Sequence, residues 1–100
     1  MTVEIKKEGS KTLVVLNGRI DTSNAGQFQS DISPLMNEEN PDIEMDCANM
    51  EYTSSQGLRI FLILQKSVSN KGGSLVLKNM SPSVKEVFDI TGFSSIIKIV

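Results

Sequence analysis

The stretch EYTSSQGLRIFLILQKSV, residues 51–68, decides how this chain folds. In it, small hydroxyl-bearing residues pass without a linker into a strongly apolar segment. Thr53 and Gln56 have the spacing of a capping box, in which the side chains of the N-cap and N3 residues each accept a hydrogen bond from the other's backbone N–H. We therefore predict a helix over about residues 54–69, ended by the turn sequence NKGG at residues 70–73.

Two adjacent serines, Ser54 and Ser55, fall in the first turn of this predicted helix. Backbone N–H groups point outward there, and the helix dipole favours negative charge. One interpretation is that the serines only cap the helix, as hydroxyl groups at helix starts commonly do. The other interpretation is that one of them carries a phosphate group on and off. The residues alone leave both open.

The predicted helix is more apolar than a helix with one buried face. A broad face is formed by five apolar side chains, namely Leu58, Phe61, Leu62, Leu64 and Val68. Ile60 and Ile63 fall on the far side of the helix. Either a neighbouring helix covers that side, or part of it is an exposed patch for a partner. Both can hold for different residues.

The remaining chain contains several strand patterns. Period-2 alternation or a short apolar run predicts strands at residues 3–8, 12–16, 42–47, 74–78 and 96–100. The first two are expected to form a hairpin around Gly9-Ser10. We expect residues 17–21 to turn the chain and residues 48–52 to form a loop.

Two further helices are expected. The first should begin after three good cap residues, Asp21, Thr22 and Ser23. Its regular part should end or kink near Ser33, because Pro34 removes a hydrogen bond and clashes with the preceding turn. The last helix opens with Ser81-Pro82, a cap residue followed by a proline at the first helical position, and ends at Gly92.

The resulting order, ββαβαβαβ, is that of a single α/β domain over residues 1–100. Alternation of strands and helices after an initial hairpin predicts a sheet whose later part is parallel, with crossover helices packed on it. We therefore predict a mixed sheet of four to five strands with about three helices.

The composition argues against several classes of function. With a net charge of −2, no basic stripe and 5% aromatic residues, the chain is not expected to bind nucleic acid. The longest apolar run, residues 60–64, is too short to cross a bilayer, and no signal-peptide pattern is present, so we expect a cytoplasmic protein without membrane insertion. The single cysteine, Cys47, has no intrachain partner for a disulfide, which fits the cytoplasm.

Catalysis is not expected either. The chain has no histidine and one cysteine, so neither a Ser–His triad nor a structural zinc site can be built. No glycine-rich phosphate loop is present, and Gly72-Gly73 is better interpreted as a turn before a strand. We therefore predict a protein that is not an enzyme and needs no cofactor or metal.

Three blocks of the sequence together resemble the STAS domain, and within it the bacterial anti-sigma-factor antagonists. LNGRID at residues 16–21 is similar to the family's turn before its first helix, L-x-G-x-[ILV]-D. YTSSQGL at residues 52–58 is similar to its helix start, aromatic-x-[DS]-S-x-G-L. SPSVKEVFDITG at residues 81–92 is similar to S-P-x-V-x-x-x-F-x-x-x-G. The blocks keep the family's order and span nearly the whole chain.

This resemblance implies a phosphorylation-gated function. In such antagonists, the unphosphorylated protein binds an anti-sigma factor that is itself a serine kinase, which frees the sigma factor. The kinase phosphorylates a serine at the helix start, and the phosphorylated protein lets go. A separate serine phosphatase resets the system.

The resemblance also implies which residues act. Aligned on Gly57-Leu58, the family's phosphorylated serine falls on Ser55, with Ser54 as the alternative. The implied partner-binding surface comprises Asp21, Thr22, Ser54, Ser55, Gln56, Gly57 and Arg59. Many family members have aspartate before the phosphorylated serine, where this chain has Ser54. A kinase with different preferences can therefore read the site, phosphate can fall on Ser54, or the switch can be lost.

Two other functions compete with this one. The same fold can serve as a constitutive adaptor, for example as a subunit of a lipid-transport ABC complex, and the apolar far side of the central helix motivates that hypothesis. Direct nucleotide binding or hydrolysis is the third, but the chain offers no Walker-type loop and no evident set of metal-binding carboxylates.

Overall fold

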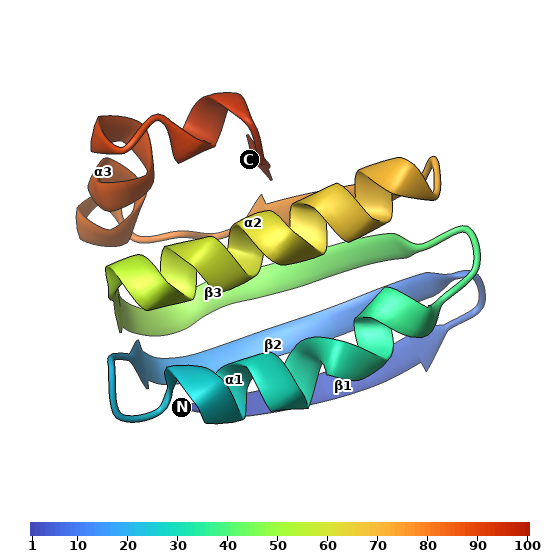
Figure 1. The fold of residues 1–100 in the computed structure, drawn as a ribbon, viewed down its shortest axis with the longest axis horizontal. Coiled ribbons are helices and arrows are strands. Elements are labelled where there is room, and N and C mark those ends of the chain that lie inside the picture. Colours follow the sequence, from blue (N-terminus) through green and yellow to red (C-terminus); the bar gives the residue numbers. More distant parts are fainter.

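One mixed sheet with its helices on a single face is the frame of the molecule in the computed structural model, which describes residues 1–100 (Figure 1). The strands lie in the order β1 (Thr2–Glu8), β2 (Lys11–Ile20), β3 (Asp42–Thr53), β4 (Ser74–Lys78) and β5 (Lys98–Ile99). The helices are α1 (Ala25–Ile32), α2 (Ser55–Asn70) and α3 (Pro82–Ile90), with two 3-10 turns, η1 (Ser33–Asn37) and η2 (Phe93–Ser95). The predicted α/β class and element order are confirmed.

The topology explains why one face carries all the helices. β1 pairs antiparallel with β2, whereas β2 to β5 are parallel neighbours in chain order. Each helical crossover therefore advances by one strand in the same direction. Because such crossovers are right-handed, each one places its helix on the same face of the sheet.

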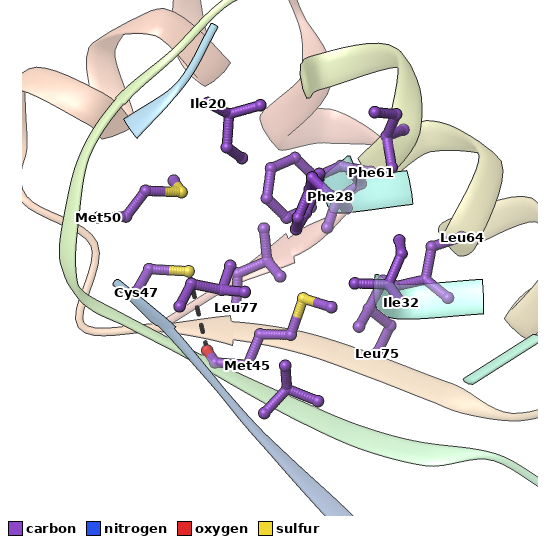
Figure 2. Packing of buried hydrophobic residues seen from close by; sticks show 14 of the residues in the cluster. Ile20, Phe28, Ile32, Met45, Cys47, Met50, Phe61, Leu64, Leu75 and Leu77 are labelled. Atoms are coloured by element: carbon purple, nitrogen blue, oxygen red, sulfur yellow. Dashed lines mark hydrogen bonds between the residues drawn. The ribbon is translucent and has the colours of Figure 1, made fainter. Parts of the chain in front are cut away.

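A single hydrophobic core fills the space between the sheet and the helices. It contains 21 buried residues, with alternate side chains of β2, β3 and β4 pointing into it. One phenylalanine from each helix joins the layers. The ring of Phe61 lies 5.3 Å from that of Phe28 and 5.6 Å from that of Phe88, between ring centroids. Figure 2 shows the rings of Phe28 and Phe61 next to each other within this cluster. Such tilted contacts favour aromatic rings over similar aliphatic groups.

Cys47 belongs to the same core, as expected from its strand pattern. Its Sγ makes only a weak contact of 3.9 Å with the carbonyl oxygen of Met45 (Figure 2). Burial in apolar surroundings raises the pKa of the Cys47 thiol to about 12. The thiol therefore stays protonated at neutral pH and acts as a small apolar side chain.

The opposite face of the sheet has no helix over it. Half-buried Leu13 and Val15 lie there among charged side chains. Glu44 Oε1 meets Lys78 Nζ at 2.5 Å and Lys11 Nζ at 3.9 Å, and the hydrogen bond from Lys78 holds the pKa of Glu44 below its usual range. Parallel sheets are usually covered on both faces. Here Lys78 lines the same surface hollow as Leu13 and Val15, next to its ion-pair partner Glu44.

Two strands run further than the sequence predicted. The expected turn at residues 17–21 and loop at residues 48–52 were wrong, because β2 continues to Ile20 and β3 to Thr53. The two extensions pair with each other across register shifts between Val15 and Asn17 and between Gly18 and Arg19. Such shifts break the period-2 alternation by which strands are recognised in sequences.

The predictions for the ends of α1 and α3 and for the last strand were confirmed in part. The regular part of α1 ends at Ile32 and η1 contains Pro34, as expected. None of the expected cap residues caps α1, which begins after Asn24. Ser81 does cap α3, because its Oγ accepts a hydrogen bond from the Val84 N–H, and Gly92 follows the helix with a φ of 81°. The last strand is shorter than the expected residues 96–100, because Ile96 and Ile97 still belong to the turn after η2 and only Lys98–Ile99 pair with β4.

The aromatic contacts of Phe61 give a test of the core. Replacing Phe61 by alanine removes a fully buried ring that touches two others, and we expect the free energy of unfolding to fall by about 3–5 kcal/mol. Ile90→Ala is the matched control, because Ile90 is 76% exposed, and it should change stability by no more than about 0.5 kcal/mol. Urea denaturation followed by circular dichroism measures both. Equal effects would contradict this description of the core.

Candidate functional site

The carboxyl ends of β2 and β3 lie side by side and bring two distant segments together. Ile20 and Thr53 are paired at the end of the parallel ladder, and the N–H of Ser54 donates to the Ile20 carbonyl at 2.8 Å. The turn after β2 and the start of α2 therefore share one edge of the sheet.

Ser54 is the N-cap of α2. Its backbone is extended, and its Oγ accepts a hydrogen bond from the Gly57 N–H at 3.3 Å. The predicted capping box of Thr53 and Gln56 was wrong, because Thr53 still belongs to β3 and is 3% exposed. The cap is therefore one residue later than the sequence spacing suggested. The Thr53 hydroxyl instead donates to the Ser54 carbonyl at 3.2 Å.

Ser55 differs from Ser54 in its exposure and in the hydrogen bonding of its hydroxyl group. Ser54 is 8% exposed and its hydroxyl is used by the cap, whereas Ser55, the first helical residue, is exposed and its side chain makes no hydrogen bond. The two adjacent serines thus have separate roles in the structure. Ser54 holds the helix start, and the Ser55 hydroxyl is free at the surface.

Gly57 allows α2 to approach the ends of both strands. A Cβ atom at this position would lie 2.3 Å from Thr53 Oγ1 and 2.9 Å from Ile20 Cγ2. Neither neighbour can move easily, because both side chains are buried. The glycine is therefore required by packing, and it fixes where the first turn of α2, including Ser55, sits on the sheet edge.

The turn after β2 is held by its own polar side chains. Asp21 Oδ1 accepts hydrogen bonds from the Ser23 hydroxyl at 2.5 Å and from the Ser23 N–H at 2.9 Å. These bonds hold the pKa of the Asp21 carboxyl below its usual value, so the carboxylate is charged at neutral pH. Asn24 closes the turn by accepting from the Asp21 N–H and donating to the Arg19 carbonyl. Thr22 lies exposed at the tip.

Sequence reasoning missed one pair at this edge. The guanidinium carbon of Arg19 lies 4.8 Å from the centre of the Tyr52 ring, a cation–π arrangement, and Tyr52 is 42% exposed. The two residues meet only because the register shift aligns them. No periodic signal in the sequence marks that shift.

Ile60 and Ile63, on the far side of α2, differ in their burial. Ile60 is buried at 4% exposure, and α1 packs beside α2, so the far side is partly covered. Ile63 remains 37% exposed. Gln56, directly after Ser55, and Arg59, one turn further along the helix, are also exposed. The far side of α2 is therefore covered at one isoleucine and exposed at the other, and the use of the exposed part by a partner stays a prediction.

The structure offers little for other ligands. No three of the Cys, Asp and Glu side chains are grouped as metal ligands would be. None of the helices combines the length and the hydropathy that crossing a bilayer requires. What the sheet edge does present is an exposed hydroxyl, a charged carboxylate and exposed arginines, which suit recognition by another protein.

The close contact at Gly57 can be tested with a matched control. Gly57→Ala should destabilise the protein by about 1–3 kcal/mol, although alanine is the better helix former, because its Cβ overlaps Thr53 and Ile20. Gly26→Ala in α1 meets nothing within 4 Å and should stabilise the protein by about 0.4–1 kcal/mol. Thermal unfolding of the two variants should shift in opposite directions. A stabilised Gly57→Ala variant would refute the close approach.

Comparisons with known proteins agree with this arrangement. The sequence profile of the STAS domain matches residues 2–100. The anti-sigma-B factor antagonist of Bacillus subtilis is 33% identical over 99 residues, which are 99% of this chain and 90% of that protein. A crystal structure of an anti-sigma factor antagonist from Mycobacterium paratuberculosis has a TM-score of 0.86 at 18% identity, covering 98% of this chain and 83% of that one.

The fold is also shared with SpoIIAA, an anti-sigma factor antagonist of known structure in two states. Its unphosphorylated form has a TM-score of 0.74 at 17% identity, covering 99% of this chain and 87% of that one. Its phosphorylated form, from Bacillus, has a TM-score of 0.73 at 18% identity, with 99% and 91% covered. From the profile match and the Bacillus subtilis relative together, the chain belongs to the STAS domain family, among the anti-sigma factor antagonists.

Proposed function

We propose that this protein binds an anti-sigma factor with serine kinase activity when it is unphosphorylated, and releases it when Ser55 is phosphorylated. The observation that carries the proposal is the exposed, uncommitted hydroxyl of Ser55 at the first position of α2. It lies at the sheet edge that also holds Asp21. The protein acts as a binding partner and not as an enzyme, and its place of action is the cytoplasm, where sigma factors work.

The two serines are not equivalent as phosphate acceptors. A kinase must reach the hydroxyl, and Ser54 is nearly buried with its oxygen engaged by the Gly57 N–H. Phosphate on Ser54 would break the cap, at a cost of about 1 kcal/mol in helix stability. Phosphate on Ser55 would break no hydrogen bond of the protein. The alternative acceptor is therefore disfavoured by the geometry of the cap.

The start of α2 suits a phosphate group. No acidic side chain lies in the first turn, so its N–H groups and dipole are not already compensated by a carboxylate. Phosphorylation adds about −1.5 to −2 charges and three acceptor oxygens. Helix N-termini accept such charge readily. The fold should therefore survive phosphorylation with little change.

Release follows from what the same charge does in an interface. A partner docked on this edge would have to desolvate the dianion next to the Asp21 carboxylate and any acids of its own. An uncompensated charge buried in this way costs several kcal/mol, and each 1.4 kcal/mol is tenfold in affinity. No conformational change is needed. A serine phosphatase would restore the binding form by removing the phosphate.

One prediction of this proposal concerns which serine receives the phosphate. Incubation with ATP and the anti-sigma factor kinase from the same genome should transfer one γ-phosphoryl group to Ser55 Oγ, with release of ADP. Ser55→Ala should lose the phosphate and keep its stability within about 0.5 kcal/mol. Ser54→Ala should keep the phosphate and lose about 0.5–2 kcal/mol of stability with its cap. Peptide mass spectrometry locates the phosphate, and its appearance on Ser54 alone would overturn this assignment.

The second prediction separates binding from folding. Ser55→Asp should weaken capture of the kinase by at least tenfold, because a carboxylate at this position imitates part of the phosphate charge. Its melting temperature should change little or rise slightly, since acids at a helix start are favourable. Calorimetric titration and thermal unfolding measure the two effects. A variant that unfolds would show that Ser55 is chiefly structural.

A further inference from the structure

Helix α2 has an unusual charge distribution for this chain. The protein has 12 acidic and 10 basic residues, yet the sixteen residues of α2 include two cations, Arg59 and Lys66, and no acid. Both cations are exposed. Neither forms an ion pair, and all five ion pairs of the structure involve other elements. The helix that starts at Ser55 is thus the one helix that carries only positive charge, since α1 has a single acid and α3 has both signs.

Arg59 stands at a particular place relative to Ser55. The two residues are four apart within α2, so their Cβ atoms are about 5–6 Å apart on the same side of the helix. Pairs with the acid on the N-terminal side, as a phosphate on Ser55 would be, have the more favourable orientation. The Arg59 side chain makes no hydrogen bond in the structure and is free to turn toward either Ser55 or a partner.

We propose that Arg59 is a shared ligand, bound by an acidic side chain of the partner when Ser55 is unmodified and by the phosphate once Ser55 is phosphorylated. This rests on the proposed function and deepens it. Phosphorylation then has two effects on the docking surface. It adds a dianion, and it withdraws the cation that the partner had used.

Other cations are less suited to this role. Lys66 is eleven residues from Ser55, about 16 Å along the helix, too far for a direct contact with the phosphate. Arg19 is already stacked on Tyr52. Arginine also binds phosphate through two parallel N–H donors, which a lysine cannot do. Arg59 is therefore the cation of α2 that both geometry and chemistry select.

The contact between phosphate and arginine can be measured without any partner. The full chain is produced with phosphoserine incorporated at position 55 by genetic encoding, so that no kinase is required. The second pKa of the phosphate, ordinarily about 6, is followed by phosphorus NMR. We expect it to be about 0.2–0.4 lower with Arg59 present than in Arg59→Gln. The other charged side chains of this edge, Arg19, Asp21 and Glu51, are identical in both proteins and cancel in the comparison.

Lys66→Gln is the matched control, because it removes the same charge from the same helix and should leave the phosphate pKa unchanged. If Arg59→Gln and Lys66→Gln shift the pKa equally, the interaction is a general field and the proposal fails. If the phosphate pKa is lower only when Arg59 is present, the phosphate–arginine contact is supported. This result needs no kinase, so a failure of the kinase to modify Ser55 would count against the proposed function and not against the contact.

The partner's use of Arg59 needs a second measurement. Binding to the purified anti-sigma factor kinase is compared for four proteins, namely the natural chain and Arg59→Gln, each unmodified and phosphorylated at Ser55. Arg59→Gln should weaken binding about fivefold in the unmodified protein and have no effect in the phosphorylated one. An equal loss in both states, or no loss in either, would overturn the proposal.

Discussion

The structure depends on the close approach of the first turn of α2 to the ends of β2 and β3. Gly57 makes that approach possible, because a Cβ there would overlap the buried side chains of Thr53 and Ile20. The Ser54 N–H completes it by bonding to the Ile20 carbonyl. The ends of β2 and β3 and the start of α2 are therefore held together by close packing at Gly57 and by one backbone hydrogen bond. This contact sets the positions of the exposed residues in the turn after β2 and in the first turn of α2.

That contact lets adjacent residues divide structure from regulation. Ser54 faces inward and caps the helix, so the fold constrains it. Ser55 faces outward at the next position and is constrained by nothing in the chain. A charged group on Ser55 therefore changes the surface without changing the frame beneath. Loss of an N-cap costs about 1 kcal/mol, whereas burial of an unpaired charge in an interface costs several, so the proposed signal acts on binding far more than on folding.

Much of this could be predicted from the sequence, and the failures have a common cause. The order of elements followed from periodicity, because most strands and helices of this chain bury one face. Position at the helix start indicated both Ser54 and Ser55, and only the family resemblance singled out Ser55. The ends of β2 and β3 could not be predicted, since their pairing passes through register shifts that erase alternation. The displaced cap follows from the same error: because β3 extends to Thr53, the cap falls on Ser54. The contact of Arg19 with Tyr52 was hidden for the same reason.

The two sides of α2 show how one element can serve the core and a signal together. Phe61 on its inner side lies between rings of the other two helices, and that packing fixes the position of α2 in the core. Its outer side carries Ser55, Arg59 and Ile63, all exposed and none engaged in an ion pair. Because packing holds the inner side of α2 in place, a phosphate on its outer side would strongly affect the binding of a partner. On a flexible segment, a phosphate could move away from a docked partner and keep its water. On a fixed helix it must stay in the interface, and its full desolvation cost opposes binding.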